Sequence, residues 1–126
     1  MVLETITTHQ ECKGMLNSVG DALYVIGGKW KLRVIIAVKD GNTRFNEIQR
    51  TIDGISAKVL SNELKDLELN GFVTRTVKTT MPVVVEYTIT EYTDTLNEVL
   101  QSLSSWGLMH REKIRREAKA EKLNLY

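Results

Sequence analysis

The stretch GISAKVLSNELKDLELNGFV, residues 54–73, decides the fold, because it contains a helix with both of its ends marked. Ser56 is a favourable N-cap residue, and Gly71 stands where a C′ glycine ends a helix. Between these two residues, helical spacing places leucines on one face, namely Leu60, Leu64 and Leu67. The stripe predicts a helix that is anchored in the core of a small domain.

The outward face of this helix is poor in acid at its start. Its residues are Ser56, Ala57, Lys58, Ser61, Asn62 and Lys65. Short donors and acceptors and flexible cations suit the major groove of DNA, where carboxylates would be repelled by phosphates. The acids Asp66 and Glu68 come later, at the end that we expect to leave the groove. The alternative is a core helix whose outward residues are simply polar, since such residues are common on any surface.

The flanking sequence predicts a helix-turn-helix with a wing. Helices are expected over about 13–26 and 30–39, followed by a short extended segment at 43–45 and a helix capped by Asn46. After residue 73 the apolar period changes to two, which predicts a hairpin with strands near 73–77 and 83–89. A long helix over about 91–119 follows, with Thr90 as its cap. The predicted fold class is mainly α with a small β-hairpin wing (α+β), a winged helix-turn-helix.

Length and composition predict one cytoplasmic domain over residues 1–126, with its core in about 12–107. The first residues lack a secretory signal, and the longest apolar run, residues 34–38, is too short to cross a membrane. A single cysteine and two distant histidines, His9 and His110, argue against an internal disulfide and against a metal site. We therefore expect no metal, no cofactor and no membrane partner.

Charge is segregated along the chain although the net charge is only +1. Six basic residues lie between Lys29 and Arg50, and six more lie between Arg111 and Lys122, whereas acid gathers near Glu4, Glu11 and Asp21. Such a distribution favours a positive face on a nearly neutral protein. For the C-terminal cluster, a solvated helix with internal ion pairs is an equally good interpretation. In the hairpin, Arg75 and Lys78 are candidates for contact with the DNA backbone or minor groove.

The last predicted helix is too long for one small domain to cover. Its apolar stripe is expected at Leu96, Leu100, Leu103, Trp106 and Ile114. This stripe needs a partner, most simply the same helix and the N-terminal helix of a second subunit. A monomer that packs the stripe against its own first helix is the alternative.

Several motifs together resemble the HxlR family of prokaryotic transcription regulators, which are relatives of the MarR group. They are GGKW at 27–30, RFNEI at 44–48, GIS at 54–56, the leucine pattern at 60–71 and EYTIT at 86–90. The resemblance covers about residues 12–107 and implies a winged-helix homodimer that binds an inverted-repeat operator. It also implies that Arg44 contacts the DNA backbone and that the face from Ser56 to Lys65 enters the major groove.

The resemblance gives Cys12 a candidate role, because an N-terminal cysteine is a thiol switch in several family members. The family's usual Cys-Pro start is here Cys12-Lys13-Gly14, and its usual glycine after the Thr90 cap is replaced by Thr93. Lys13 and a nearby helix N-terminus favour a thiolate at Cys12, whereas Glu11 opposes it. The alternative is a small buried cysteine without reactivity.

The sequence thus predicts a sequence-specific DNA-binding transcription regulator, a homodimer on an inverted-repeat operator, with Cys12 as a candidate redox or electrophile sensor. A small-molecule effector is also open. An enzyme is disfavoured, since no catalytic grouping of residues appears. The competing interpretation is a winged-helix module for protein–protein contact, because a fold does not dictate its use.

Overall fold

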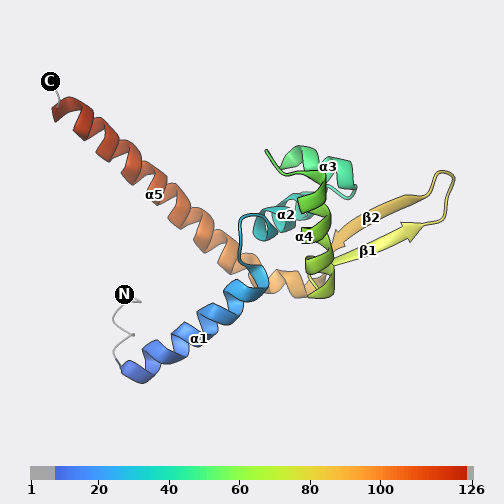
Figure 1. Cartoon of the computed structure of the whole chain (residues 1–126), viewed down its shortest axis with the longest axis horizontal. Helices are drawn as coiled ribbons and strands as arrows, with labels where there is room; N and C mark the ends of the chain where they lie inside the picture. The colour runs from blue at the N-terminus through green and yellow to red at the C-terminus, as the bar shows by residue number, and fades with distance from the viewer. Residues whose placement is uncertain (1–7, 125–126) are drawn as a thin grey trace. The chain divides into compact units, whose positions relative to one another are not determined.

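The computed structural model describes residues 8–124, with side chains through residue 123; Glu4 therefore lies outside the described residues. Four helices come first (Figure 1): α1 (His9–Ile26), α2 (Lys31–Lys39), α3 (Phe45–Thr51) and α4 (Ala57–Leu69). An antiparallel hairpin follows, with β1 (Val73–Lys78) and β2 (Val84–Ile89). The 3₁₀ helix η2 (Glu91–Leu96) and α5 (Asn97–Asn124) complete the described chain. The predicted fold class, mainly α with a β-hairpin wing, is confirmed.

The chain divides into two compact units between Thr90 and Glu91. The first unit contains the helix-turn-helix and its wing, and the second contains η2 and α5. Within the first unit, the hairpin projects beyond the packed helices α2, α3 and α4 (Figure 1). The single-domain organisation over residues 1–126 stays a prediction.

The core of the first unit lies where α2, α3 and α4 meet the base of the hairpin. Its buried apolar residues are Val34, Ile35, Ala37, Val38, Ile48, Ile52, Ile55, Leu60, Leu64, Leu67, Phe72 and Val73. Helix α2 buries Val34, Ile35, Ala37 and Val38 but leaves Ile36 half exposed, and α4 buries its complete leucine stripe. Burial of this stripe fixes the rotation of α4 about its own axis, because it leaves one definite face outward.

The end of α4 is a Schellman motif built on Gly71. The Gly71 N–H donates to the Glu68 carbonyl at 3.1 Å, and the Phe72 N–H donates to the Leu67 carbonyl at 2.9 Å. Gly71 has a φ of +83°, which residues with a side chain rarely adopt. The motif turns the chain directly into β1, so that the wing starts beside the end of α4.

The hairpin pairs Val73 with Ile89 at its base and Lys78 with Val84 near its tip. The segment before α3 lies along β2, since the Tyr87 N–H donates to the Thr43 carbonyl at 2.8 Å. Arg44 has extended backbone dihedrals, as predicted, but residues 43–45 do not form a strand, and Phe45 already belongs to α3.

Two helix starts differ from the predictions. Helix α1 begins at His9, four residues early, because the Thr8 hydroxyl accepts the Glu11 N–H at 3.0 Å and caps it. Helix α3 is capped at Arg44 and not at Asn46, because the Glu47 carboxylate accepts the Arg44 N–H at 3.0 Å. In both places a side-chain oxygen accepts an N–H of the first turn, from Thr8 in α1 and from Glu47 in α3, and the helix begins earlier than predicted.

The last helix also differs from its prediction. Thr90 is not at the start of α5, because the 3₁₀ helix η2 lies between Thr90 and Asn97. The Thr90 hydroxyl donates to the carbonyls of Gly71 and Phe72, which belong to the link between α4 and β1. The chain then forms the 3₁₀ helix η2 before α5 begins at Asn97, and α5 extends to Asn124.

Candidate nucleic-acid interface

The outward face of α4 is a continuous strip beside the buried leucines. Residues Ser56, Ala57, Lys58, Asn62 and Lys65 are exposed, and Ser61 is half-buried. The Ser56 hydroxyl accepts the Val59 N–H at 3.1 Å, which confirms the predicted cap. The helix therefore starts at an exposed end whose remaining N–H groups and partial positive charge suit an anion.

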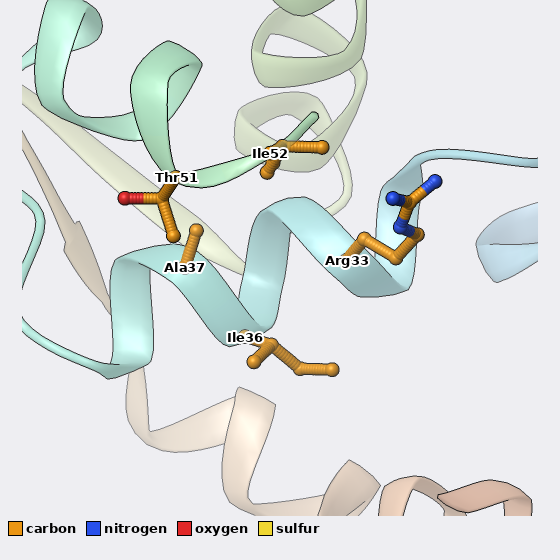
Figure 2. Close-up of a pocket in the computed structure, with 5 residues that line it drawn as sticks. All are labelled: Arg33, Ile36, Ala37, Thr51 and Ile52. Carbon is orange, nitrogen blue, oxygen red and sulfur yellow. The ribbon is translucent and has the colours of Figure 1, made fainter. Parts of the chain in front are cut away.

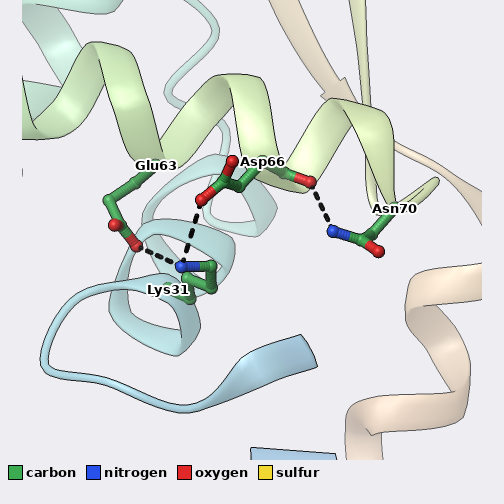
Figure 3. A network of polar contacts seen from close by, with 4 residues as sticks. All are labelled: Lys31, Glu63, Asp66 and Asn70. Carbon is green, nitrogen blue, oxygen red and sulfur yellow. Dashed lines mark hydrogen bonds and ion pairs between the residues drawn. The ribbon is translucent and has the colours of Figure 1, made fainter. Parts of the chain in front are cut away.

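The acids Glu63 and Asp66 of α4 are held away from this strip by Lys31 of α2. The Lys31 ammonium lies 3.2 Å from a Glu63 carboxylate oxygen and 3.4 Å from an Asp66 carboxylate oxygen (Figure 3). The Lys31 side chain is only 16% exposed. In the sequence, Lys31 belongs to the basic cluster that we expect on a positive face. In the structure it is instead mostly buried and forms ion pairs within the domain. One sequence feature indicated this inward position: Lys31 directly follows the GGKW motif, at the start of a helix with a buried face.

The Lys31 pKa reflects these two partners. Desolvation on its own would lower the pKa of Lys31, but hydrogen bonding and charge from Glu63 and Asp66 together outweigh it. The pKa of Lys31 is therefore raised above its ordinary value of 10.5, and the side chain stays charged at neutral pH.

A polar hollow of ≈ 300 Å³ separates α4 from the hairpin. It is lined by Ser61, Lys65, Glu68, Arg75 and Tyr87. Arg75 and Tyr87 are cross-strand partners, so both reach the hollow from one face of the wing. Two cations, two hydroxyls and one carboxylate meet here, and Tyr87 is a candidate that sequence reasoning missed. Glu68 lines the same hollow as Lys65. The sequence predicted instead that Glu68 lies away from the DNA-reading residues.

Lys78 lies on the opposite face of the hairpin from Arg75, because successive strand residues alternate between faces. Its ammonium is 3.0 Å from a Glu86 carboxylate oxygen. The two candidate wing cations are therefore not brought together. Lys78 is half-exposed and already has an acidic partner, which a phosphate would have to replace.

Arg44 is exposed at the start of α3. Together with Thr43, Asn46, Glu47 and Arg50 it lines an open polar hollow of ≈ 430 Å³. Arg50 is one turn and a half further along the same short helix and is also exposed. Two guanidinium side chains and one carboxylate side chain line the hollow, so its lining has a formal charge of +1, which favours contact with a backbone phosphate. Arg50 is a second candidate beyond those that the sequence singled out.

A second basic group surrounds Trp30, before and within α2. The Lys29 ammonium is 4.8 Å, and the Arg33 guanidinium carbon 4.9 Å, from the centre of a Trp30 ring. Arg33 also borders a shallow hollow between α2 and the end of α3 (Figure 2), where Ala37 and Thr51 point toward one another. The cations here are held by an aromatic ring, and the hollow beside them is largely apolar.

Cys12 is exposed on the first turns of α1, which excludes a buried cysteine within the single chain. Its N–H donates to the Thr8 carbonyl at 3.1 Å. Cys12 and Gly14 both lie within α1, which begins at His9. The residues beside Cys12 on one side of α1 are apolar and exposed: Met15, Leu16, Val19 and Leu23.

The stripe expected for the dimer is divided in the structure. Leu103, Trp106 and Ile114 of α5 are each about half exposed, Leu100 is partly covered, and Trp106 stacks on His110 with ring centres 4.9 Å apart. Leu96 differs from these, because it belongs to η2 and is only 8% exposed in the single chain. The 3₁₀ turn changes the helical phase, so Leu96 does not continue the exposed stripe of α5.

Residues 8–124 include no helix that is long and apolar enough to cross a membrane. In the same range, no group of three or more His, Cys, Asp or Glu side chains could hold a metal ion.

The model of the HxlR-like helix-turn-helix family matches residues 25–115. The chain belongs to this family. It is 41% identical over 95 residues to an HTH-type transcriptional regulator of Methanothermobacter thermautotrophicus, covering 75% of this chain and 72% of the relative. The match begins at the end of α1 and includes the helix-turn-helix, the wing and most of α5.

Two solved structures connect the family to redox regulation. The redox regulator HypR in its reduced form is 37% identical, with a TM-score of 0.71, covering 78% of this chain and 97% of that one. Reduced YodB of Bacillus subtilis is 39% identical, with a TM-score of 0.63, covering 71% and 87%. YodB is also known in diamide-treated and quinone-bound forms. The HxlR-type chain is thus a transcriptional regulator, and its relatives are regulators rather than enzymes.

Proposed function

We propose that this HxlR-type regulator binds double-stranded DNA sequence-specifically, with the outward strip of α4 in the major groove. The observation that carries the proposal is the sorting of charge on α4. Its exposed strip has Lys58, Ser61, Asn62 and Lys65, whereas Glu63 and Asp66 are turned to Lys31 of α2. A module for protein–protein contact would more often expose a large apolar patch on this strip, whose only apolar side chain is the small Ala57.

Base reading and phosphate contact are assigned to different residues. Lys58 reaches a guanine edge, Asn62 an adenine edge, and Ser61 either, from the N-terminal half of the recognition helix. Arg44, Lys65, Arg75 and Lys78 contact the backbone, and the N-terminus of α4 from Ser56 and Ala57 adds main-chain donors for a phosphate. Arg50 and Tyr87 join these from the hollows that they line.

The protein acts as a homodimer on an inverted repeat. Support comes from the exposed apolar stripe of α1 and from Leu103, Trp106 and Ile114 of α5, with Leu100 beside them. A two-fold dimer would place two α4 helices about 34 Å apart, one turn of DNA. Replacing Leu103 and Trp106 by Glu should convert the dimer to a monomer in analytical ultracentrifugation. A monomer of the unaltered chain at micromolar concentration would contradict this part.

Cys12 is the proposed sensor of oxidants or electrophiles in the cytoplasm. It is exposed on the first turns of α1, beside the apolar stripe, and HypR and YodB are relatives with redox or quinone-bound forms. Diamide or a quinone should release DNA from the unaltered protein but not from Cys12→Ser. If Cys12→Ser releases DNA equally, the sensor role is wrong.

The DNA-reading role is tested by fluorescence anisotropy with a duplex from upstream of the chain's own gene and a shuffled duplex. Lys58→Ala or Asn62→Ala should reduce the preference for the specific duplex, by about 1–3 kcal/mol for each side chain that no longer reads a base edge. Arg44→Ala should weaken binding to both duplexes and lower the salt slope by about 1. Absence of binding to either duplex, and of retention on heparin, would favour the protein–protein module.

A further inference from the structure

Helix α4 has an unfavourable formal charge for an element that enters a phosphate-lined groove. Its two lysines, Lys58 and Lys65, stand against three carboxylates, Glu63, Asp66 and Glu68, which leaves the helix at −1. Unpaired carboxylates close to DNA phosphates reduce affinity, and at physiological salt such charges act over about 8 Å. A DNA-reading α4 therefore needs a compensating cation from another part of the domain.

Lys31 supplies this cation from the first residue of α2. Glu63 and Asp66 are three residues apart on α4, so both lie on the same side of the helix and one ammonium group reaches both. Figure 3 shows the Lys31 ammonium between the two carboxylates, with the Asn70 amide donating to the backbone carbonyl of Asp66 at 2.9 Å. Most of the contact is shielded from solvent, because the Lys31 and Glu63 side chains are 16% and 18% exposed.

Asp66 is the carboxylate that matters most for DNA. Its side chain is 54% exposed, and it follows Asn62 by four residues, so the two are neighbours along the helix surface. Without Lys31 the Asp66 carboxylate would be free to turn toward the strip that contains Asn62. With Lys31 it is drawn toward α2, and its charge is partly offset there by an ammonium group that it shares with Glu63.

We propose that Lys31 is a positioning residue for DNA binding: it masks the carboxylates of Glu63 and Asp66 and fixes α4 on α2, without touching DNA itself. This inference rests on the proposed DNA-binding function. The domain thereby keeps Glu63 and Asp66 on its recognition helix for internal packing and turns both away from the strip that contains Lys58 and Asn62.

The test compares DNA affinity and thermal stability in Lys31→Met, in the triple variant K31M/E63Q/D66N, and in Lys113→Met as a control. Substitution of Lys113 also removes an ion pair, to Glu117 at 2.8 Å, but Lys113 lies on α5 in the second unit. Affinity is measured by anisotropy at low, physiological and high salt, with the upstream duplex and its shuffled counterpart. Circular dichroism gives the melting temperature of each variant.

At low salt, Lys31→Met should weaken binding to both duplexes about tenfold, because two unscreened carboxylates then face phosphates. The loss of affinity should shrink at high salt, which a misplaced helix would not show. The triple variant should bind at least as tightly as the unaltered protein, since the net charge at the three positions is then zero rather than −1. Lys113→Met should leave affinity unchanged.

Three results would overturn the masking role while leaving DNA binding intact. They are unchanged affinity in Lys31→Met, a loss of affinity that is the same at all salts, and a triple variant that stays as weak as Lys31→Met, which would indicate direct phosphate contact. If Lys31→Met does not fold, the E63Q/D66N double variant decides: it should bind at least as tightly as the unaltered protein, and weaker binding contradicts masking. If the unaltered protein binds neither duplex at low salt, the proposed function itself fails.

Discussion

Helices α4 and α1 carry the same kind of apolar stripe, but only α4 has its stripe covered within the chain. Leu60, Leu64 and Leu67 of α4 are fully buried, whereas α1 has no buried residue and leaves Leu16 74% exposed. Both helices also start in the same way, with a hydroxyl that accepts an N–H three residues later. Helical periodicity therefore identifies an apolar face, but it does not show whether the same chain or another molecule covers that face.

The largest effect should come from removing part of the covered stripe. Leu64→Ala leaves a cavity in the core and should lower the free energy of unfolding by about 2–5 kcal/mol, measured by urea denaturation. The matched change Leu16→Ala should lower it by less than about 0.5 kcal/mol at concentrations where the chain is monomeric. Equal decreases from the two changes would mean that α1 is covered within the single chain.

Replacing a glycine by alanine should change stability in opposite directions just after α4 and within α1. Gly71→Ala puts a side chain on a backbone with φ of +83° and should destabilise by about 1–2 kcal/mol. Gly14→Ala lies within α1, where a new Cβ would meet nothing within 4 Å, and should stabilise that helix by about 0.5–1 kcal/mol. Urea denaturation measures the first and far-UV circular dichroism the second. Destabilisation by Gly14→Ala would indicate a close neighbour on α1.

Removing the N-cap of α4 should lower the stability of the whole domain, whereas removing the N-cap of α1 should affect only the start of that helix. Ser56→Ala removes a 3.1 Å bond at the start of α4 and should lower global stability by about 1 kcal/mol. Thr8→Ala removes a 3.0 Å bond at the start of α1, and should only fray that end, seen as faster amide hydrogen exchange in residues 9–12. A drop in the global unfolding free energy on Thr8→Ala would show that α1 folds cooperatively with the core.

The smallest effect concerns pH and is specific to α4. Because the folded-state pKa of Lys31 is raised above 10.5, its stabilising contribution is complete below that pH and is lost as pH rises through the folded pKa. Lys31→Met should therefore flatten the decline of stability above pH 10.5, by no more than about 1 kcal/mol. Urea denaturation at a series of alkaline pH values measures it. An unchanged alkaline decline would mean that other groups cause it.

Local sequence signals predicted a helix correctly where its cap, its apolar stripe and its terminating glycine were all present. The α4 prediction succeeded because a cap at Ser56, a stripe of leucines and a glycine at the end all indicated one helix. The prediction for α3 was wrong at its start, because Asn46 is a favourable cap residue by type, whereas Glu47 reaches back to the Arg44 N–H. The prediction of Thr90 as the cap of the last helix was wrong for a different reason: the 3₁₀ helix η2 follows Thr90, and α5 begins only at Asn97.

The residues of the candidate interface could be predicted from the sequence, but their positions relative to one another could not. Helical spacing was enough to place Lys58, Ser61, Asn62 and Lys65 on one outward strip. It could not show that Arg75 meets this strip while Lys78 lies on the other face of the wing with Glu86, since that follows from strand register and contact with α4.

Local sequence was enough to predict the order of the main helices and strands, the winged-helix class and the family, because caps, periods and motifs act between residues close in the chain. The charge that α4 presents depends on tertiary packing. Lys31 and Glu63 are 32 residues apart, and no local pattern pairs them. An ion pair of this kind depends on which faces of two helices are buried together, and that is a property of the packed core.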